Sequence, residues 1–181
     1  MSPSLPLHLF SRLISVALTL IGLAAPAPAH AAHAASKHVV IGPITGLPLP
    51  RFASLSSDRV NVRSGPGLRY PILWTYVRRD IPVEVVAEFG LYRRVVDAEG
   101  KKGWIYGEFL SGRRTVLITG KNRALRADPS ATAATVLRAE PGVIGRLKSC
   151  SGSWCEIRIA GRYGYMRKVD FFGALPDQHT P

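Results

Sequence analysis

Histidine, the side chain best suited to acid–base chemistry near neutral pH, is confined to the two ends of this 181-residue chain. The five histidines are His8, His30, His33, His38 and His179. A Cys–His or Ser–His–Asp hydrolase needs an imidazole beside its nucleophile, and residues 39–178 offer none. Asp97 and Glu99 suggest a carboxylate pair, but Asp97-Ala98-Glu99-Gly100 has the composition of a turn. We therefore predict a protein without catalytic residues, cofactor or metal site.

Cys150 and Cys155 are the two cysteines, and Ser-Gly-Ser-Trp separates them. This spacing is not the Cys-x-x-Cys of redox proteins. Residues that flank a four-residue hairpin loop lie opposite each other, within the Cα separation that a disulfide accepts. In an exported protein, a disulfide is the expected state of such a pair. We predict a structural disulfide between Cys150 and Cys155.

The N-terminal residues have the pattern of a secretory signal. Arg12 precedes an apolar stretch from Leu13 to Ala25, and Ala-x-Ala cleavage sites follow it. The stretch is shorter than the about 20 residues that span a bilayer. We expect residues 1–31 to be a signal peptide, and the protein to be exported to the periplasm or secreted, without a transmembrane anchor.

The formal net charge is +12, from 24 Lys+Arg against 12 Asp+Glu. Such a charge attracts anionic partners, or it serves solubility alone. Three Arg-Arg pairs contribute to it, at positions 78–79, 93–94 and 113–114. Neighbouring residues on a strand point to opposite faces, so an extended pair cannot form one patch. Solvated surface and contact with an anionic polymer both remain open.

Residues 32–53 are rich in Ala, Pro and Gly and lack a regular period, which predicts an extended linker. Beyond residue 53 the sequence repeats weakly. The matched segments are 62–66 with 125–129, Tyr92 with Trp154, and 103–105 with 164–166. Offsets of 61 to 63 indicate two copies of one unit. We place the domains at 54–117 and 118–176, followed by a tail at 177–181.

Each copy has the pattern of short β-strands. Arg59–Arg63 alternates polar and apolar residues, and Ile81–Phe89 is rich in β-branched residues, with turn signals such as Gly65-Pro66-Gly67 between strands. Ala131–Ala139 resembles a helix in its alanine content. Its Thr and Val content and its place in the repeat predict a strand instead.

Aromatic side chains on strands lie in the core more often than on a ligand surface. In the strand expected over Trp154–Ile159, Cys155 and Ile157 form the apolar face, which places Trp154 on the outer face. By the repeat, Tyr92 and Arg94 share that face. An exposed aromatic ring beside an arginine suits a sugar ring or a peptide. The candidate ligand-binding residues are Tyr70, Tyr92, Arg94, Trp104, Tyr106 and Trp154.

The segments Asn61-Val62-Arg63-Ser64-Gly65-Pro66-Gly67, Tyr70-Pro71-Ile72 and Gly103-Trp104-Ile105 closely resemble the bacterial SH3-like domain family. The second copy departs from the pattern, because Leu125-Arg126-Ala127-Asp128-Pro129 lacks the Ser-Gly-Pro-Gly turn. The resemblance covers residues 54–176. It implies an all-β protein of two tandem small SH3-like barrels, each partly open and built from five to seven strands.

The resemblance also implies a non-catalytic binding module for cell-wall peptidoglycan or an envelope peptide. The alternatives are a periplasmic protein–protein adaptor or inhibitor, an anionic-polymer binder and a cell-wall hydrolase. Export argues against nucleic acid as the partner. The identity of the ligand and the oligomeric state stay open.

Overall fold

The structure is a computed structural model that describes residues 40–175. The predicted signal peptide, its cleavage sites, the first part of the predicted linker and the tail lie outside the described residues. Among residues 40–175, no helix is long and apolar enough to cross a membrane.

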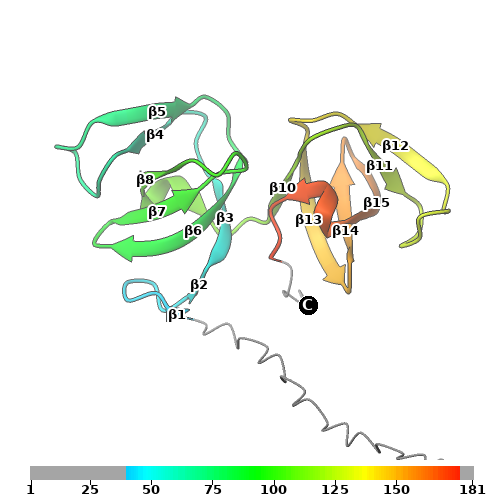
Figure 1. The fold of residues 1–181 in the computed structure, drawn as a ribbon, viewed down its shortest axis with the longest axis horizontal. Coiled ribbons are helices and arrows are strands. Elements are labelled where there is room, and N and C mark those ends of the chain that lie inside the picture. The colour runs from blue at the N-terminus through cyan, green and yellow to red at the C-terminus, as the bar shows by residue number, and fades with distance from the viewer. Residues whose placement is uncertain (1–39, 176–181) are drawn as a thin grey trace, which may run out of the picture. The chain divides into compact units, whose positions relative to one another are not determined.

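Two seven-stranded antiparallel sheets make up most of the described chain (Figure 1). The first sheet has the order β5-β4-β8-β7-β6-β3-β9. Its strands are β3 (Arg51–Leu55), β4 (Val60–Arg63), β5 (Ile72–Tyr76), β6 (Pro82–Phe89), β7 (Tyr92–Val96), β8 (Lys102–Tyr106) and β9 (Leu110–Ser111). A short 3-10 helix, η1 (Gly107–Phe109), connects β8 to β9.

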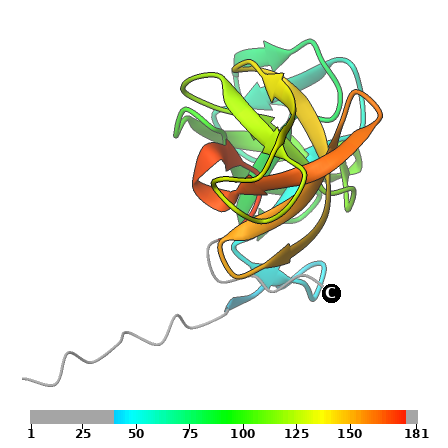
Figure 2. The ribbon, with the colours of Figure 1, turned by 90° about the vertical axis from the view of Figure 1, so that its right-hand side faces the viewer.

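The second sheet has the order β12-β11-β15-β14-β13-β10-β16. Its strands are β10 (Thr115–Ile118), β11 (Arg123–Arg126), β12 (Thr135–Ala139), β13 (Ile144–Ser151), β14 (Trp154–Ile159), β15 (Arg162–Arg167) and β16 (Phe171–Phe172), with the 3-10 helix η2 (Lys168–Asp170) before β16. Figure 2 shows how strongly these strands curve.

The two sheets repeat the same topology, strand for strand. Each strand of the first sheet has its counterpart at the same place in the order of the second, from β5 and β12 at one edge to β9 and β16 at the other. The all-β fold of two tandem barrels is therefore confirmed. The strand predicted within Ala131–Ala139 is confirmed over Thr135–Ala139.

Each barrel has its own core of side chains with almost no exposure. In the first barrel Val62, Val85 and Ile105 are fully buried, and in the second Leu125, Ile157 and Met166 are. These residues alternate along their strands with exposed or half-buried ones, as a sheet with one buried face requires.

The predicted linker is wrong for residues 40–53. These residues form β1 (Val40–Ile41) and β2 (Pro48–Leu49), which pair as a hairpin, and the start of β3. Two-residue strands show no period in sequence, and the hairpin is fixed by a residue from elsewhere in the chain. The carboxylate of Glu88 on β6 accepts the backbone N–H groups of Ile44 (2.9 Å) and Thr45 (3.0 Å).

The domain boundaries predicted at 54 and 118 also differ from the structure. Strand β3 begins at Arg51 and strand β10 begins at Thr115, so each sheet starts three residues earlier than expected.

The predicted disulfide between Cys150 and Cys155 is confirmed. The two residues are direct partners across β13 and β14, with a Cα–Cα distance of 4.0 Å. The turn between the strands holds only Gly152 and Ser153, and Gly152 has a φ of 54° that favours glycine. Both cysteines belong to the buried core of the second barrel, so the disulfide joins the hairpin inside that core.

Replacing both cysteines, Cys150→Ala with Cys155→Ala, is expected to lower the free energy of unfolding by about 2 kcal/mol, because closing so short a loop removes little chain entropy. Urea unfolding monitored by near-UV circular dichroism measures the effect. Reductant should destabilise the wild-type protein by a similar amount and leave the double variant unchanged. Equal stability of oxidised and reduced wild-type protein would contradict this role.

Candidate ligand-binding groove

Four of the six candidate residues share one face of the first barrel. Along β7, Arg93 and Val95 are buried, so Tyr92 and Arg94 point to the opposite face. Strand β8 alternates in the same way, with Gly103 and Ile105 buried and Trp104 and Tyr106 on the other face. The register pairs Tyr92 with Tyr106 and Arg94 with Trp104. The outer face predicted for Tyr92 and Arg94 is therefore observed.

A hollow of about 480 Å³ opens at one end of this face, and we call it the first groove. Its lining residues are Asn61, Arg63, Leu68, Leu91, Tyr92, Tyr106 and Phe109. The three rings form a continuous series with edge-on contacts: Tyr92 and Tyr106 lie 5.5 Å apart and Tyr106 and Phe109 lie 6.0 Å apart, measured between ring centroids. The floor of the first groove is therefore aromatic.

Two leucines border the first groove and are unusually exposed. Leu68 is 79% exposed and Leu91 is 64% exposed. Both sit in turns, Leu68 in the loop before β5 and Leu91 between β6 and β7. Apolar side chains that gather around an aromatic hollow are typical of a ligand-binding surface.

Arg63 fixes the loop that carries Leu68. Its guanidinium Nη1 donates to the carbonyl oxygens of Tyr70 (2.8 Å) and Leu68 (3.2 Å). The ring of Tyr70 packs over Gly65 so closely that a side chain at Gly65 would overlap it. The structure thus places Tyr70 within the loop, not among the residues that line the first groove.

The second barrel has an equivalent contact between an arginine and its loop. Arg126 stands where Arg63 does, and its Nη1 donates to the carbonyl oxygen of Ala133 at 2.8 Å. In both barrels the acceptor lies seven residues after the arginine. The same contact between arginine and loop is therefore present in both copies, although the turn sequence differs between them.

A second groove, of about 290 Å³, lies at the matching place on the second barrel. Trp154 lines it, together with Arg123, Arg126, Arg138, Arg167 and Asp170. Apart from Tyr70 in the loop, the structure therefore separates the candidate residues into three places. Tyr92 and Tyr106 line the first groove, Trp154 lines the second, and Trp104 and Arg94 lie beside the first groove on the same sheet face.

Five residues that line the first groove were not among the predicted candidates: Asn61, Arg63, Leu68, Leu91 and Phe109. The two leucines gave no signal in the sequence, because an exposed leucine in a turn is common and points to a binding surface only when it lies beside the rings.

Not every arginine pair is solvated surface. Arg93 is 9% exposed, and its Nε lies 3.6 Å from the carboxylate of Glu88. Arg51 reaches the same carboxylate at 2.9 Å. Of the pair Arg93-Arg94, only Arg94 is exposed, because neighbouring residues on a strand point to opposite faces.

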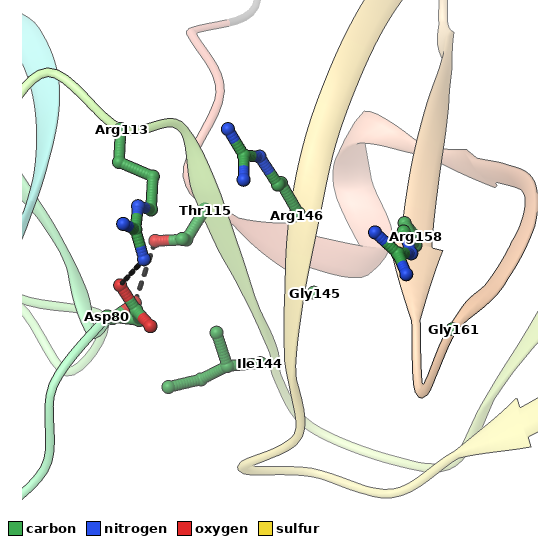
Figure 3. Close-up of a pocket in the computed structure, with 8 residues that line it drawn as sticks. All are labelled: Asp80, Arg113, Thr115, Ile144, Gly145, Arg146, Arg158 and Gly161. Carbon is green, nitrogen blue, oxygen red and sulfur yellow. Dashed lines mark hydrogen bonds and ion pairs between the residues drawn. The ribbon is translucent and has the colours of Figure 1, made fainter.

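A third hollow, of about 250 Å³, is lined mainly by polar residues (Figure 3). Arg113 forms an ion pair with Asp80 at 3.1 Å, and the hydroxyl of Thr115 donates to the carbonyl oxygen of Asp80. Arg146 and Arg158 are direct partners across β13 and β14 and are both exposed. No aromatic side chain lines this hollow, so it differs in chemistry from both grooves.

The turn predicted at Asp97-Ala98-Glu99-Gly100 is observed. The Oδ1 atom of Asp97 accepts the backbone N–H groups of Glu99 and Lys101, each at 2.9 Å, and Gly100 has a φ of 80°. The carboxylate of Asp97 therefore organises a turn, and Glu99 is paired with Lys101 at 2.6 Å.

No match to this chain was found among curated proteins. Two solved structures, NlpC1 and NlpC2 from Trichomonas vaginalis, each align with a TM-score of 0.33, at 13% and 12% identity. The alignments cover 74% and 72% of this chain, which spans about half of each of those chains, 49% and 51%.

The bacterial SH3 domain family matches the chain twice, over residues 56–112 and 119–169. The first match lies within the sheet that carries the first groove, and the second lies within the other sheet. Together they cover more than half of the sequence, and the chain belongs to the bacterial SH3 domain family.

Proposed function

We propose that this protein is an exported, non-catalytic binding protein whose first groove recognises cell-wall peptidoglycan or an envelope peptide. One observation supports this most directly: Tyr92, Tyr106 and Phe109 form an aromatic floor between two leucines that are more than half exposed. Membership of a family of binding modules and the buried disulfide are consistent with a secreted binding role.

The chemistry of the first groove suits a ligand with both apolar and polar faces. Tyrosine rings stack on the apolar face of a sugar or on a side chain, while their hydroxyl groups hydrogen-bond at the rim. Asn61 and Arg63 add polar groups at one side of the groove. Glycan strands with peptide branches offer both kinds of surface, as does an extended peptide.

A protein–protein adaptor or inhibitor is the second candidate. The exposure of Leu68 and Leu91 favours it, because a peptide side chain that packs between them would remove both from water. The two functions differ in outcome: an adaptor captures one defined envelope protein and does not bind purified cell-wall sacculi.

Replacing the two facing tyrosines, Tyr92→Ala with Tyr106→Ala, is expected to weaken binding to purified peptidoglycan sacculi by at least about thirtyfold. An aromatic side chain that dominates the centre of an interface contributes about 2 kcal/mol, which is a factor of about thirty in affinity, and the contributions of two adjacent rings do not simply add. Co-sedimentation of the purified protein with increasing amounts of sacculi measures the effect.

Tyr163→Ala is the matched control, because Tyr163 is a half-exposed tyrosine of the second barrel (49% exposed) that lines neither groove. It should leave sedimentation unchanged. Wild-type binding by a folded Tyr92/Tyr106 double variant would rule out the first groove as the sacculus site. If the wild-type protein fails to sediment but retains one envelope protein in a pull-down that the double variant loses, the adaptor function replaces the proposal.

A further inference from the structure

The two grooves occupy equivalent positions but have different chemistry. Arg126 takes the place of Arg63 and Trp154 takes the place of Tyr92, so one polar and one aromatic position are retained. The other positions change in character: Leu68 becomes Ala131, Tyr106 becomes Arg167, and Phe109 becomes Asp170. Two of the three ring positions of the first groove are therefore charged in the second, and the leucine is reduced to alanine.

The charges that line the second groove are strongly unbalanced. Its four arginines, at positions 123, 126, 138 and 167, face a single carboxylate, Asp170. Asp170 is an internal counter-ion: it pairs with Arg123 at 2.7 Å and with Arg167 at 3.4 Å, and its side chain is only 13% exposed. The lining of the groove keeps a net formal charge of +3 after this pairing.

The arginines differ in how much of their hydrogen-bonding capacity is used. Arg126 holds the loop through Ala133, as described above. Arg123 is mostly buried, and its Nε has no hydrogen-bond partner among residues 40–175. Arg138 and Arg167 are exposed, with half of the Arg167 side chain open to solvent beside its ion pair. Both exposed arginines thus line the groove that Trp154 also lines, and Arg167 is the direct cross-strand partner of Trp154.

We propose that the second groove binds an oxyanion, a carboxylate or a phosphate, through Arg138 and Arg167, with the adjacent part of the ligand against Trp154. The planar guanidinium group donates two parallel hydrogen bonds to either oxyanion, which gives stronger and more directional contacts than neutral donors. The ion pair with Asp170 restricts the Arg167 side chain, so part of the ordering cost is met before the ligand arrives. This inference does not depend on the function proposed for the first groove.

The test uses two probes of defined chemistry, a hexaglutamate peptide for carboxylates and short-chain polyphosphate for phosphates. Isothermal titration calorimetry of the purified protein at 0.15 M salt should show saturable binding of at least one probe. The variant Arg138→Gln/Arg167→Gln is expected to weaken that binding at least tenfold. The probe that binds identifies the oxyanion; binding of both indicates that charge and shape alone are recognised.

The matched control is Arg146→Gln/Arg158→Gln, which removes the same charge from exposed strand positions in the hollow of Figure 3. It should retain wild-type affinity. Equal losses of affinity in both double variants would mean that binding follows net charge, which would overturn the proposal. The proposal would also be overturned if neither probe showed saturable binding. If Arg138→Gln/Arg167→Gln fails to fold, Arg138→Gln alone serves, since Arg138 makes no ion pair in the described part of the chain; an unchanged affinity in a folded variant overturns the assignment.

Discussion

Glu88→Gln is expected to lower the free energy of unfolding by about 3–5 kcal/mol, the cost of removing one partner from a buried charged network. The side chain of Glu88 is fully buried and lies between the guanidinium groups of Arg51 and Arg93. It also accepts hydrogen bonds from Ile44 and Thr45. Glutamine keeps the shape but removes the charge, which leaves the buried Arg93 and the half-buried Arg51 without their counter-ion.

Urea unfolding measures the loss, and amide hydrogen exchange locates it. The N–H groups of Ile44 and Thr45 should exchange faster in the variant, because Glu88 is their acceptor. Glu99→Gln is the matched control: its ion pair with Lys101 is exposed on both sides, and such pairs contribute little. Equal stability of Glu88→Gln and wild-type protein would show that the hairpin and β6 do not depend on this carboxylate.

The same carboxylate gives a pH dependence of defined sign. Burial alone would raise the pKa of Glu88, but hydrogen bonds from Thr45, Ile44 and Arg51 outweigh it and lower the pKa from 4.5 to about 2. A lowered pKa in the folded state stabilises the protein fully above pH 4.5, and this contribution is lost as the pH falls toward 2. The difference in stability between wild type and Glu88→Gln should therefore shrink between pH 5 and pH 2. A constant difference over that range would contradict the lowered pKa.

Glu88 also shows where sequence reasoning stops. The alternation Arg93-Arg94-Val95 predicts opposite faces correctly, but it cannot say that the inward arginine meets a carboxylate. Residues 40–53 look like a linker because their strands are two residues long and owe their position to Glu88, more than forty residues away from Ile44. A segment whose conformation depends on a distant side chain has no local hydrophobic periodicity that would reveal it in the sequence.

The features that were predictable are those with local signatures. Alternation in Trp154–Ile159 places Cys155 and Ile157 inside and Trp154 outside, as observed. The spacing of the two cysteines across a short hairpin predicted their pairing. The repeat predicted that Tyr92 and Trp154 are equivalent, and both line grooves. Leu68, Leu91 and Phe109 reach the first groove from a loop, a turn and the 3-10 helix η1, and their proximity is a property of the folded barrel.

Gly164→Ala is expected to destabilise the second barrel by about 3 kcal/mol, at the upper end of what overpacking costs. An added Cβ would lie 2.6 Å from the carbonyl oxygen of Arg126 and 2.7 Å from Cγ of Leu125. Neither can move freely: Arg126 pairs with Tyr165 in the sheet, and Leu125 is fully buried. Relief therefore requires β11 and β15 to separate. Thermal unfolding measures the loss, and Gly112→Ala, whose added methyl meets no atom within 4 Å, is the control.

The equivalent glycine of the first barrel, Gly103, tests whether this close approach is part of the shared fold. A Cβ there would overlap Cγ1 of the buried Val62 and come within 3.2 Å of the carbonyl oxygen of Arg63, so Gly103→Ala should also destabilise, in its own barrel. In both barrels the glycine lets one strand approach the backbone of the arginine that fixes the groove loop. Each alanine variant should therefore disturb its own groove as well as its own core. Hydrogen exchange that rises in the other barrel, or in neither, would show that the two glycines do not share this role.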